Sequence, residues 1–450
     1  MGSGASRTST EMSEAGSART SYARLIRNAN YLRVFSAGIG SFAGSAISGV
    51  CLIWIVFEST GSAFDVGLLG TAAVAGSILF SVFGGTLVDR YDRRRLMILS
   101  DLVRAAAMGS VVLVLVARGF DLPVILGAYF LIGAFSTVFN PAEQALVPAL
   151  VGSAEVADAN GLVRSSRSSV QFAGAAIGGI LIVTTGANTG LAVNALTFLL
   201  SATLLAGMRM PSAPRTDLAR TARPAYFADL KEGFRWLYRA QGFFQLTLSA
   251  MLFNFCANFV FTFLVFFTTE LLHGSALVFA LLLAVEVLGG GIGSLLVGRV
   301  GSARYAGKAW TIPYGVASGL LALALIVFPS VPVALGTIFA LGVLGGFAGT
   351  SWLTAAQLLV PSKLQGRYYG IDNLGSVAIL PVAQIGGAVL IGISGLRATY
   401  LEVALLWVVA GVAFLFPRAL MRLGVPPGAT SRSADAGSGT SGSPAGTRSE

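Results

Sequence analysis

The chain has 450 residues, of which 55% are hydrophobic and only 11% are charged, and its formal net charge is +10. An ordinary soluble domain carries charges at roughly 25% of its positions, so this composition excludes a soluble enzyme, a secreted domain and a disordered chain. Two cysteines, Cys51 and Cys256, and a single histidine exclude a disulfide framework and a multi-histidine metal centre. A polytopic membrane protein is the class that remains.

The predicted spans follow from runs with few or no charges, because a transmembrane helix requires about 20 apolar residues. In chain order the first runs are 34–57, 66–88, 96–117, 122–142 and 168–208, the last holding two helices that meet at 184–190. The later runs are 240–269, 272–298, 309–362, 373–396 and 399–416, and prolines at 329 and 332 divide 309–362 into two helices. These runs are too long and too evenly apolar for β-barrel strands. The prediction is therefore an all-α membrane protein with twelve transmembrane helices.

The runs group into two six-helix bundles with polar segments around them. We expect a polar N-terminal tail at 1–29, a first bundle at 30–208, a connector at 209–240, a second bundle at 241–417 and a disordered tail at 418–450. The first 30 residues lack the apolar core of a signal peptide. Phe227, Leu230, Phe234 and Leu237 recur at helical spacing in the connector, which predicts an amphipathic helix that lies on the membrane surface or acts as a strut between the bundles.

The basic residues predict the orientation. Arginines and lysines gather in the N-terminal tail, in the loop between the second and third spans and in the connector, whereas the opposite side has only Arg118 and Arg397. By the positive-inside rule, both termini are cytoplasmic. The net charge of +10 is therefore a topology signal and does not indicate nucleic-acid binding.

The two halves carry weak internal repeats in the same order. Residues 84–90, 142–148 and 177–179 match 293–299, 355–361 and 385–387, respectively. Parallel six-helix repeats place a substrate site between the halves near the bilayer midplane. This arrangement is typical of alternating-access transporters.

One loop carries a family signature. Residues 85–94, Gly-Thr-Leu-Val-Asp-Arg-Tyr-Asp-Arg-Arg, resemble the G-x-x-x-D-R-x-G-R-R motif of the major facilitator superfamily, with Asp92 in place of its second glycine. Residues 89–95, 100–105, 140–142, 159–162 and 229–234 are similar to the branch that includes macrolide and enterobactin-type siderophore exporters. The resemblance implies the twelve-helix fold and efflux of small lipophilic or amphiphilic molecules. Two departures weaken the case for proton antiport: the fourth span has no arginine, and Ala175 replaces the proline of an exporter motif in the fifth span.

The motif residues predict a conformational latch. Gly84 and Gly85 permit close helix packing, and Asp89 can accept from the amides at the N-terminus of a neighbouring helix. We expect Arg90, Arg93 and Arg94 to pair with Asp101 or Glu143 in one conformation, the alternative being that these arginines only hold the loop inside.

Other charged residues lie near span ends. Asp101 and Arg104 are three residues apart and are expected to form one ion pair on a helix face. Glu143 is placed at the end of the fourth span, as a candidate gate contact. Arg164 and Arg167 open the fifth span and are expected to extend to the membrane surface.

Glu286 is the least expected charge, because it lies near the middle of the eighth span. A carboxylate at that depth is costly and is a candidate functional group. It either carries the coupling proton, or pairs with a cationic substrate, or makes a structural hydrogen bond. Asn254, Asn258, Gln171 and Gln384 are uncharged polar residues within spans, which either contact substrate or hydrogen-bond between helices.

The expected function is therefore a multi-pass transporter of the cell (inner or plasma) membrane, monomeric, with a small-molecule substrate, protons as coupling ion and no cofactor or metal. The alternatives are an importer or uniporter of the same fold, a membrane-embedded enzyme and a non-transporting scaffold. An enzyme would require clustered acid, base or nucleophile residues, and the clusters here are loop arginines. A scaffold would not require Glu286 at mid-membrane depth.

Overall fold

The computed structural model describes residues 24–152, 155–208, 226–300 and 306–423. Within these residues all regular structure is helical, and twelve helices are long and apolar enough to cross a membrane. The predicted fold class and number of spans are confirmed. The predicted breaks at 184–190 and at Pro329–Pro332 also separate helices in the structure.

The N-terminal half consists of six helices. They are α2 (Ala29–Thr60), α3 (Ala63–Arg90), α4 (Arg93–Ala117), α5 (Leu122–Leu150), α6 (Val156–Thr184) and α7 (Ala187–Ala206). Polar side chains begin several of them: Asn28, Ser62, Asp92 and Asp121 each accept a hydrogen bond from a backbone amide of the first turn. Asp92, which departs from the superfamily motif, is thus the N-cap of α4 and accepts from the Arg95 amide at 2.8 Å.

The C-terminal half also has six spans, and three of them contain π-helical stretches. Its elements are α9 (Gln241–Thr262), α10 (Leu264–Phe266), η3 (Phe267–Leu271), α11 (Ala276–Val300), α12 (Ala306–Ala309), η5 (Trp310–Ala317), α13 (Ser318–Val327), α14 (Val331–Leu359), α15 (Ser362–Pro381), η6 (Val382–Gly386), α16 (Gly387–Ser394), α17 (Leu396–Ala413) and α18 (Arg418–Met421). Pro313 lies in η5 and Pro381 directly precedes η6. Proline lacks the amide donor that an α-helix needs, which favours such local irregularity.

Glycines bring helices of one half into close contact. A Cβ on Gly76 of α3 would overlap the Phe130 carbonyl of α5, and one on Gly133 of α5 would overlap the Ala73 carbonyl of α3. In the C-terminal half, Gly289 and Gly346 approach the backbones of α14 and α11, respectively, in the same way. Small residues at these crossings provide the van der Waals contact that drives helix association in a bilayer.

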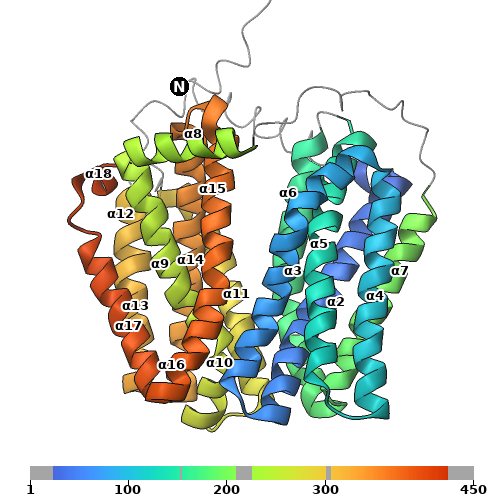
Figure 1. Cartoon of the computed structure of the whole chain (residues 1–450), viewed down its shortest axis with the longest axis horizontal. Coiled ribbons are helices and arrows are strands. Elements are labelled where there is room, and N and C mark those ends of the chain that lie inside the picture. The colour runs from blue at the N-terminus through green and yellow to red at the C-terminus, as the bar shows by residue number, and fades with distance from the viewer. Residues whose placement is uncertain (1–23, 153–154, 209–225, 301–305, 424–450) are drawn as a thin grey trace, which may run out of the picture.

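Figure 1 shows the two halves side by side, with the connecting helix α8 (Tyr226–Arg239) lying across one end of the C-terminal half. We call this end the connector end. Leu237 of α8 is buried and Phe234 is exposed, whereas the side chains of Phe227 and Leu230 lie outside the described residues. Helix α18 lies at the same end, and its Leu420 is buried, so ordered chain continues beyond the predicted start of the tail at Arg418.

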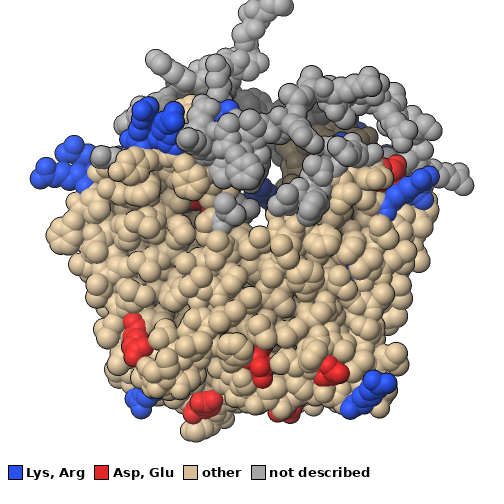
Figure 2. All heavy atoms as spheres, in the orientation of Figure 1, with Lys and Arg blue, Asp and Glu red and all other residues tan. Residues whose placement is uncertain are grey.

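The halves contact each other near the end opposite the connector. Thr71 of α3 donates to Gln384 Oε1 of η6 at 3.1 Å. The rings of Phe57 and Phe266 meet edge to face at 4.9 Å, and Trp54 lies 6.4 Å from Phe279. At the connector end, Figure 2 shows the surface hollowed between the halves. It also shows a broad uncharged band with acidic and basic residues at its two margins, as a membrane-spanning bundle requires.

Candidate functional site

An ion pair lies inside the N-terminal half, where charges are costly. Arg104 pairs with Asp101, one turn earlier on α4, and both side chains are buried. Asp101 also accepts hydrogen bonds from Ser201 of α7 at 2.5 Å and from Ser41 of α2 at 3.4 Å. Its carboxylate therefore has three donors, and the pair joins α2, α4 and α7.

Two aromatic rings enclose the Arg104 guanidinium. Its central carbon lies 4.4 Å from the ring centroid of Phe139 and 4.6 Å from that of Phe198. A desolvated cation between two ring faces gains cation–π attraction in addition to its ion pair. The predicted ion pair between residues 101 and 104 is thus present, and hydroxyl groups and aromatic rings surround it.

A second ion pair joins α5 and α6, and here the sequence-based placement was wrong. Glu143 accepts from Arg167 at 2.5 Å, with side chains 4% and 26% exposed. Glu143 does not end its span: α5 continues for seven residues beyond it, through Pro148. Arg167 lies eleven residues inside α6, which begins at Val156, and its guanidinium binds the buried Glu143 carboxylate.

Glu143 is closely packed, but it has fewer hydrogen-bond donors than Asp101. A Cβ on Gly38 of α2 would overlap the Glu143 carboxylate. The Arg167 guanidinium lies 5.4 Å from the Phe42 ring, and its Nε is buried without a hydrogen bond within the described part of the chain. Arg167 is the one described donor to Glu143, whereas three groups hold Asp101. The Glu143–Arg167 pair is therefore the more changeable of the two.

The arginines of the loop between α3 and α4 bind backbone carbonyls and not the expected carboxylates. Arg93 donates to the Ala145 carbonyl at 2.9 Å, and Arg94 donates to the carbonyls of Leu205 at 2.7 Å and Ala206. Because α7 ends at Ala206, Arg94 neutralises the negative end of its helix dipole. In this conformation Arg93 and Arg94 do not pair with Asp101 or Glu143, since each carboxylate already has another arginine partner, and the predicted latch stays a prediction.

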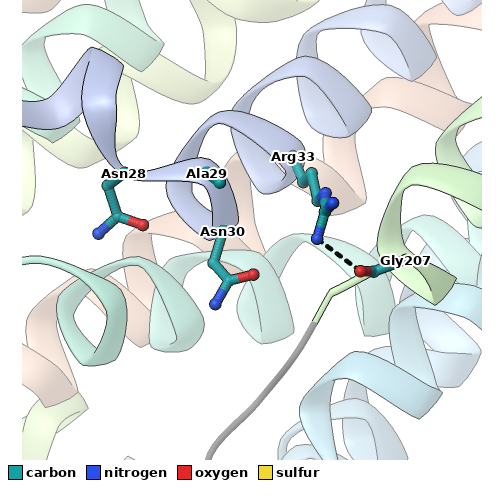
Figure 3. Close-up of a pocket in the computed structure, with 5 residues that line it drawn as sticks. All are labelled: Asn28, Ala29, Asn30, Arg33 and Gly207. Carbon is teal, nitrogen blue, oxygen red and sulfur yellow. Dashed lines mark hydrogen bonds between the residues drawn. The ribbon is translucent and has the colours of Figure 1, made fainter.

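The remaining motif residues and a nearby pocket complete this region. The backbones of Gly84, Gly85, Asp89 and Arg90 belong to α3, but their side-chain surroundings lie outside the described residues. Arg33 donates to the Gly207 carbonyl at 2.5 Å, just beyond α7. Figure 3 shows this contact in a surface pocket that Asn28, Ala29 and Asn30 also line. The pocket lies on the N-terminal half, next to the Leu205 and Ala206 carbonyls that accept from Arg94.

Glu286 lies in the middle of α11 and points away from lipid. Leu277 and Leu295 are each nine residues from it, which is two and a half helical turns, and both are exposed. Glu286 is therefore on the opposite side of the helix and is only half-buried. Within the described residues no hydrogen bond or ion pair holds its carboxylate.

Polar groups of two neighbouring helices lie near Glu286. The Tyr314 hydroxyl of η5 is near enough to be affected by the Glu286 charge, and it donates to Asn254 Oδ1 of α9 at 3.5 Å. Tyr314 belongs to a π-helical stretch, and such stretches are frequent at functional sites. Spans 7, 8 and 9 thus bring an amide, a carboxylate and a phenol together in the C-terminal half.

The other predicted polar residues have separate surroundings. Asn258 accepts from Thr262 on its own helix at 3.3 Å, and Gln171 is exposed on α6. Gln384 belongs to the contact between the halves, where it accepts from Thr71 and lies against Gly70. Most phenylalanines of α9 and α10 are buried inside the C-terminal half, as Phe253 is against Tyr314.

Sequence reasoning missed Tyr314 and Asp372. Asp372 is a buried carboxyl on α15 that directly precedes the uncharged run 373–396, so it lay outside the predicted span. Tyr314 carried no signal except its place beside Pro313. Within the described ranges, no three histidine, cysteine, aspartate or glutamate side chains gather as a metal site would require.

Comparison with known proteins agrees with this architecture. Residues 34–383 match the model of the Major Facilitator Superfamily. The chain belongs to the Major Facilitator Superfamily. It is a multi-pass protein of the cell membrane and a transporter of a small molecule rather than an enzyme.

The similar proteins include named efflux proteins. The chain is 26% identical to the multidrug efflux pump Tap of Mycobacterium tuberculosis over 425 residues, covering 89% of this chain and 97% of that protein. It is 32% identical to macrolide efflux protein A of Streptococcus pyogenes over 220 residues, covering 48% of this chain and 53% of that protein.

Solved structures share the fold. A bacterial homolog of the human lysosomal transporter Spinster has a TM-score of 0.68 and 15% identity, covering 89% of this chain and 99% of its own. The nucleoside transporter NupG has a TM-score of 0.66 and 13% identity, covering 86% of this chain and 98% of its own.

Proposed function

We propose that this transporter exports small lipophilic or amphiphilic molecules, macrolide-like compounds among them, in exchange for protons. The observation that carries the proposal is Glu286, a half-buried carboxylate at the centre of α11 that faces away from lipid and has no ion-pair partner among the described residues. A proton can neutralise such a group, which a membrane interior otherwise disfavours. The efflux direction is supported by the names of the similar proteins, Tap and macrolide efflux protein A.

Alternating access would occur between the halves 30–208 and 241–417. The contacts of Thr71 with Gln384 and of Phe57 with Phe266 close the end opposite the connector, and the hollow lies at the connector end. We take the connector end as cytoplasmic because the basic loops gather there. The conformation described here would then be open to the cytoplasm and ready to receive substrate.

The substrate class follows from the groups that a molecule between the halves would meet. Asn254 and Tyr314 offer one amide and one phenol beside Glu286, and the closed end presents aromatic rings. Few polar groups among apolar walls suit a largely lipophilic molecule with one or two hydrogen-bonding or cationic groups. The chain would work as a monomer, since each copy contains both halves.

Inverted membrane vesicles test this function. When the vesicle interior is made acidic, we expect a macrolide and a lipophilic cationic dye to accumulate in vesicles that contain the wild-type protein. An uncoupler should abolish this accumulation. Glu286→Gln should abolish gradient-driven accumulation but keep substrate binding. Glu270→Gln is the matched control, because Glu270 lies in η3 beyond the end of α10 and is exposed.

Three outcomes would contradict the proposal. Substrate uptake that only reaches equilibrium and is unaffected by the uncoupler would indicate a uniporter, and accumulation in intact cells would indicate an importer. Full gradient-driven transport by Glu286→Gln would remove Glu286 from the coupling mechanism.

A further inference from the structure

A second carboxyl group in the C-terminal half lacks a charged partner. Asp372 of α15 is only 8% exposed, and its Oδ1 is buried without a hydrogen bond to any group that the structure describes. Glu143 and Asp101, in contrast, each have an arginine. An ionised carboxylate that is buried and unpaired is strongly disfavoured, so Asp372 requires a bound cation or a proton.

Thr247, the residue beside Asp372, also lacks a hydrogen-bond partner among the described groups. Thr247 of α9 is 7% exposed, and its hydroxyl lies close to the Asp372 carboxyl. An ionised carboxylate can only accept, but a protonated one also donates. The Thr247 hydroxyl can donate to Asp372 in either state, but it can accept a hydrogen bond from Asp372 only when the carboxyl group is protonated.

Aromatic side chains surround this pair and keep water away. Tyr368 lies one turn before Asp372, and its hydroxyl accepts from the Trp352 indole of α14 at 3.2 Å. Its ring lies 6.0 Å from Trp236 of α8 and 5.4 Å from Phe243 of α9. A site enclosed in this way is better suited to a proton than to a hydrated ion.

No described cation acts on Asp372. The titratable groups nearest to it are the hydroxyls of Tyr368 and Tyr369 on α15 itself. Arg235 and Arg239 of α8 are exposed, and α9 and α14 present Thr247 and Trp352. A sodium ion would need several more oxygen ligands than Asp372 and Thr247 supply, whereas a proton needs one acceptor.

We propose that Asp372 binds a proton that it shares with Thr247 Oγ1, and that this is a second proton-binding site besides Glu286. The site joins α9 to α15, and α15 also packs against α3 of the other half. Movement of the halves therefore acts on α15: when water reaches the carboxyl, its O–H bond breaks and the proton passes to water. Proton binding stands on the geometry alone, whereas its use in transport rests on the proposed function.

Infrared difference spectroscopy of the purified full-length protein, without substrate, tests proton binding. At neutral pH we expect the carbonyl stretch of a protonated, buried carboxyl group that disappears in Asp372→Asn. Thr247→Val should shift this band because it removes the acceptor, and Thr247→Ser should leave it in place. Glu286→Gln should not change it, so the two sites are distinguished.

Two results would overturn the assignment. One is a spectrum of Asp372→Asn, or of Thr247→Val if the first variant does not fold, that equals the wild-type spectrum in the carboxyl region. The other is a thermal stability that rises with sodium chloride but not with choline chloride in the wild type, while neither salt raises the stability of the variants. This result would indicate that the site binds Na⁺. In transport assays, Asp372→Asn should lower the number of protons exchanged per substrate from two to one. Failure of that assay with an intact infrared result would contradict the transport role only.

Discussion

Replacing Arg104 with methionine tests how far the buried ion pair stabilises the N-terminal half. Methionine retains an apolar stem between the rings of Phe139 and Phe198 but removes the charge. The Asp101 carboxylate then keeps only the hydroxyls of Ser201 and Ser41. The main energetic effect is therefore an uncompensated negative charge in the bundle.

The structure sets the expected magnitude. Removing one partner of a buried ion pair costs about 3–5 kcal/mol, and the two hydroxyl donors that remain place Asp101 at the lower end. We expect Arg104→Met to lower the free energy of unfolding by about 3 kcal/mol. The double variant with Asp101→Asn removes the lone charge, and we expect a loss of about 1.5–2 kcal/mol, the lower end of the range for lost hydrogen bonds to charged groups.

Unfolding in mixed micelles with increasing SDS, followed by tryptophan fluorescence, measures these differences. Arg118→Met is the control, because Arg118 is exposed at the end opposite the connector and should be neutral. The reasoning is refuted if Arg104→Met is as stable as the wild type. It is also refuted if the double variant is no more stable than Arg104→Met, since charge imbalance would then not be the cause.

Two further substitutions test the other contacts. Gly38→Ala should destabilise the protein and lower transport because its Cβ would displace the Glu143 carboxylate, whereas Gly40→Ala, which meets no atom within 4 Å, should be neutral or stabilising by up to about 1 kcal/mol. If Gly40→Ala destabilised the protein as much as Gly38→Ala, the cause would be the alanine in this helix and not the contact with Glu143. In a background without Cys51 and Cys256, a short cleavable cross-linker between Thr71→Cys and Gln384→Cys should stop transport, and reduction should restore it. Transport that continues with the link in place would show that this contact does not open during the cycle.

Helix class and number were predictable because lipid requires long, uniformly apolar runs whose backbone groups bond internally. Helix ends were less predictable where charges lie inside a helix. The uncharged runs ended at Ala142 and began at Ser168, yet α5 continues to Leu150 and α6 begins at Val156. Charge was treated as a boundary, but a charge with a partner inside the bundle is tolerated at membrane depth.

The candidate site was predictable in part for the same reason. Glu286 was found because it interrupts a long apolar run, and such an interruption is visible in sequence. Asp372 was missed because it borders a run and so resembles a loop residue. Its importance comes from Thr247, which approaches from α9, a helix distant in the chain.

The sequence by itself determined the membrane class, the twelve spans, the gathering of basic residues in one set of loops and the carboxylate at the centre of the eighth span, because each depends on the identity and order of residues along the chain. Only the tertiary structure decided which arginine neutralises which carboxylate. Arg93 and Arg94 bind carbonyls, Arg104 binds Asp101 and Arg167 binds Glu143. Several arginines compete for two carboxylates, and the choice depends on the depth and facing of helices that pack from different parts of the chain.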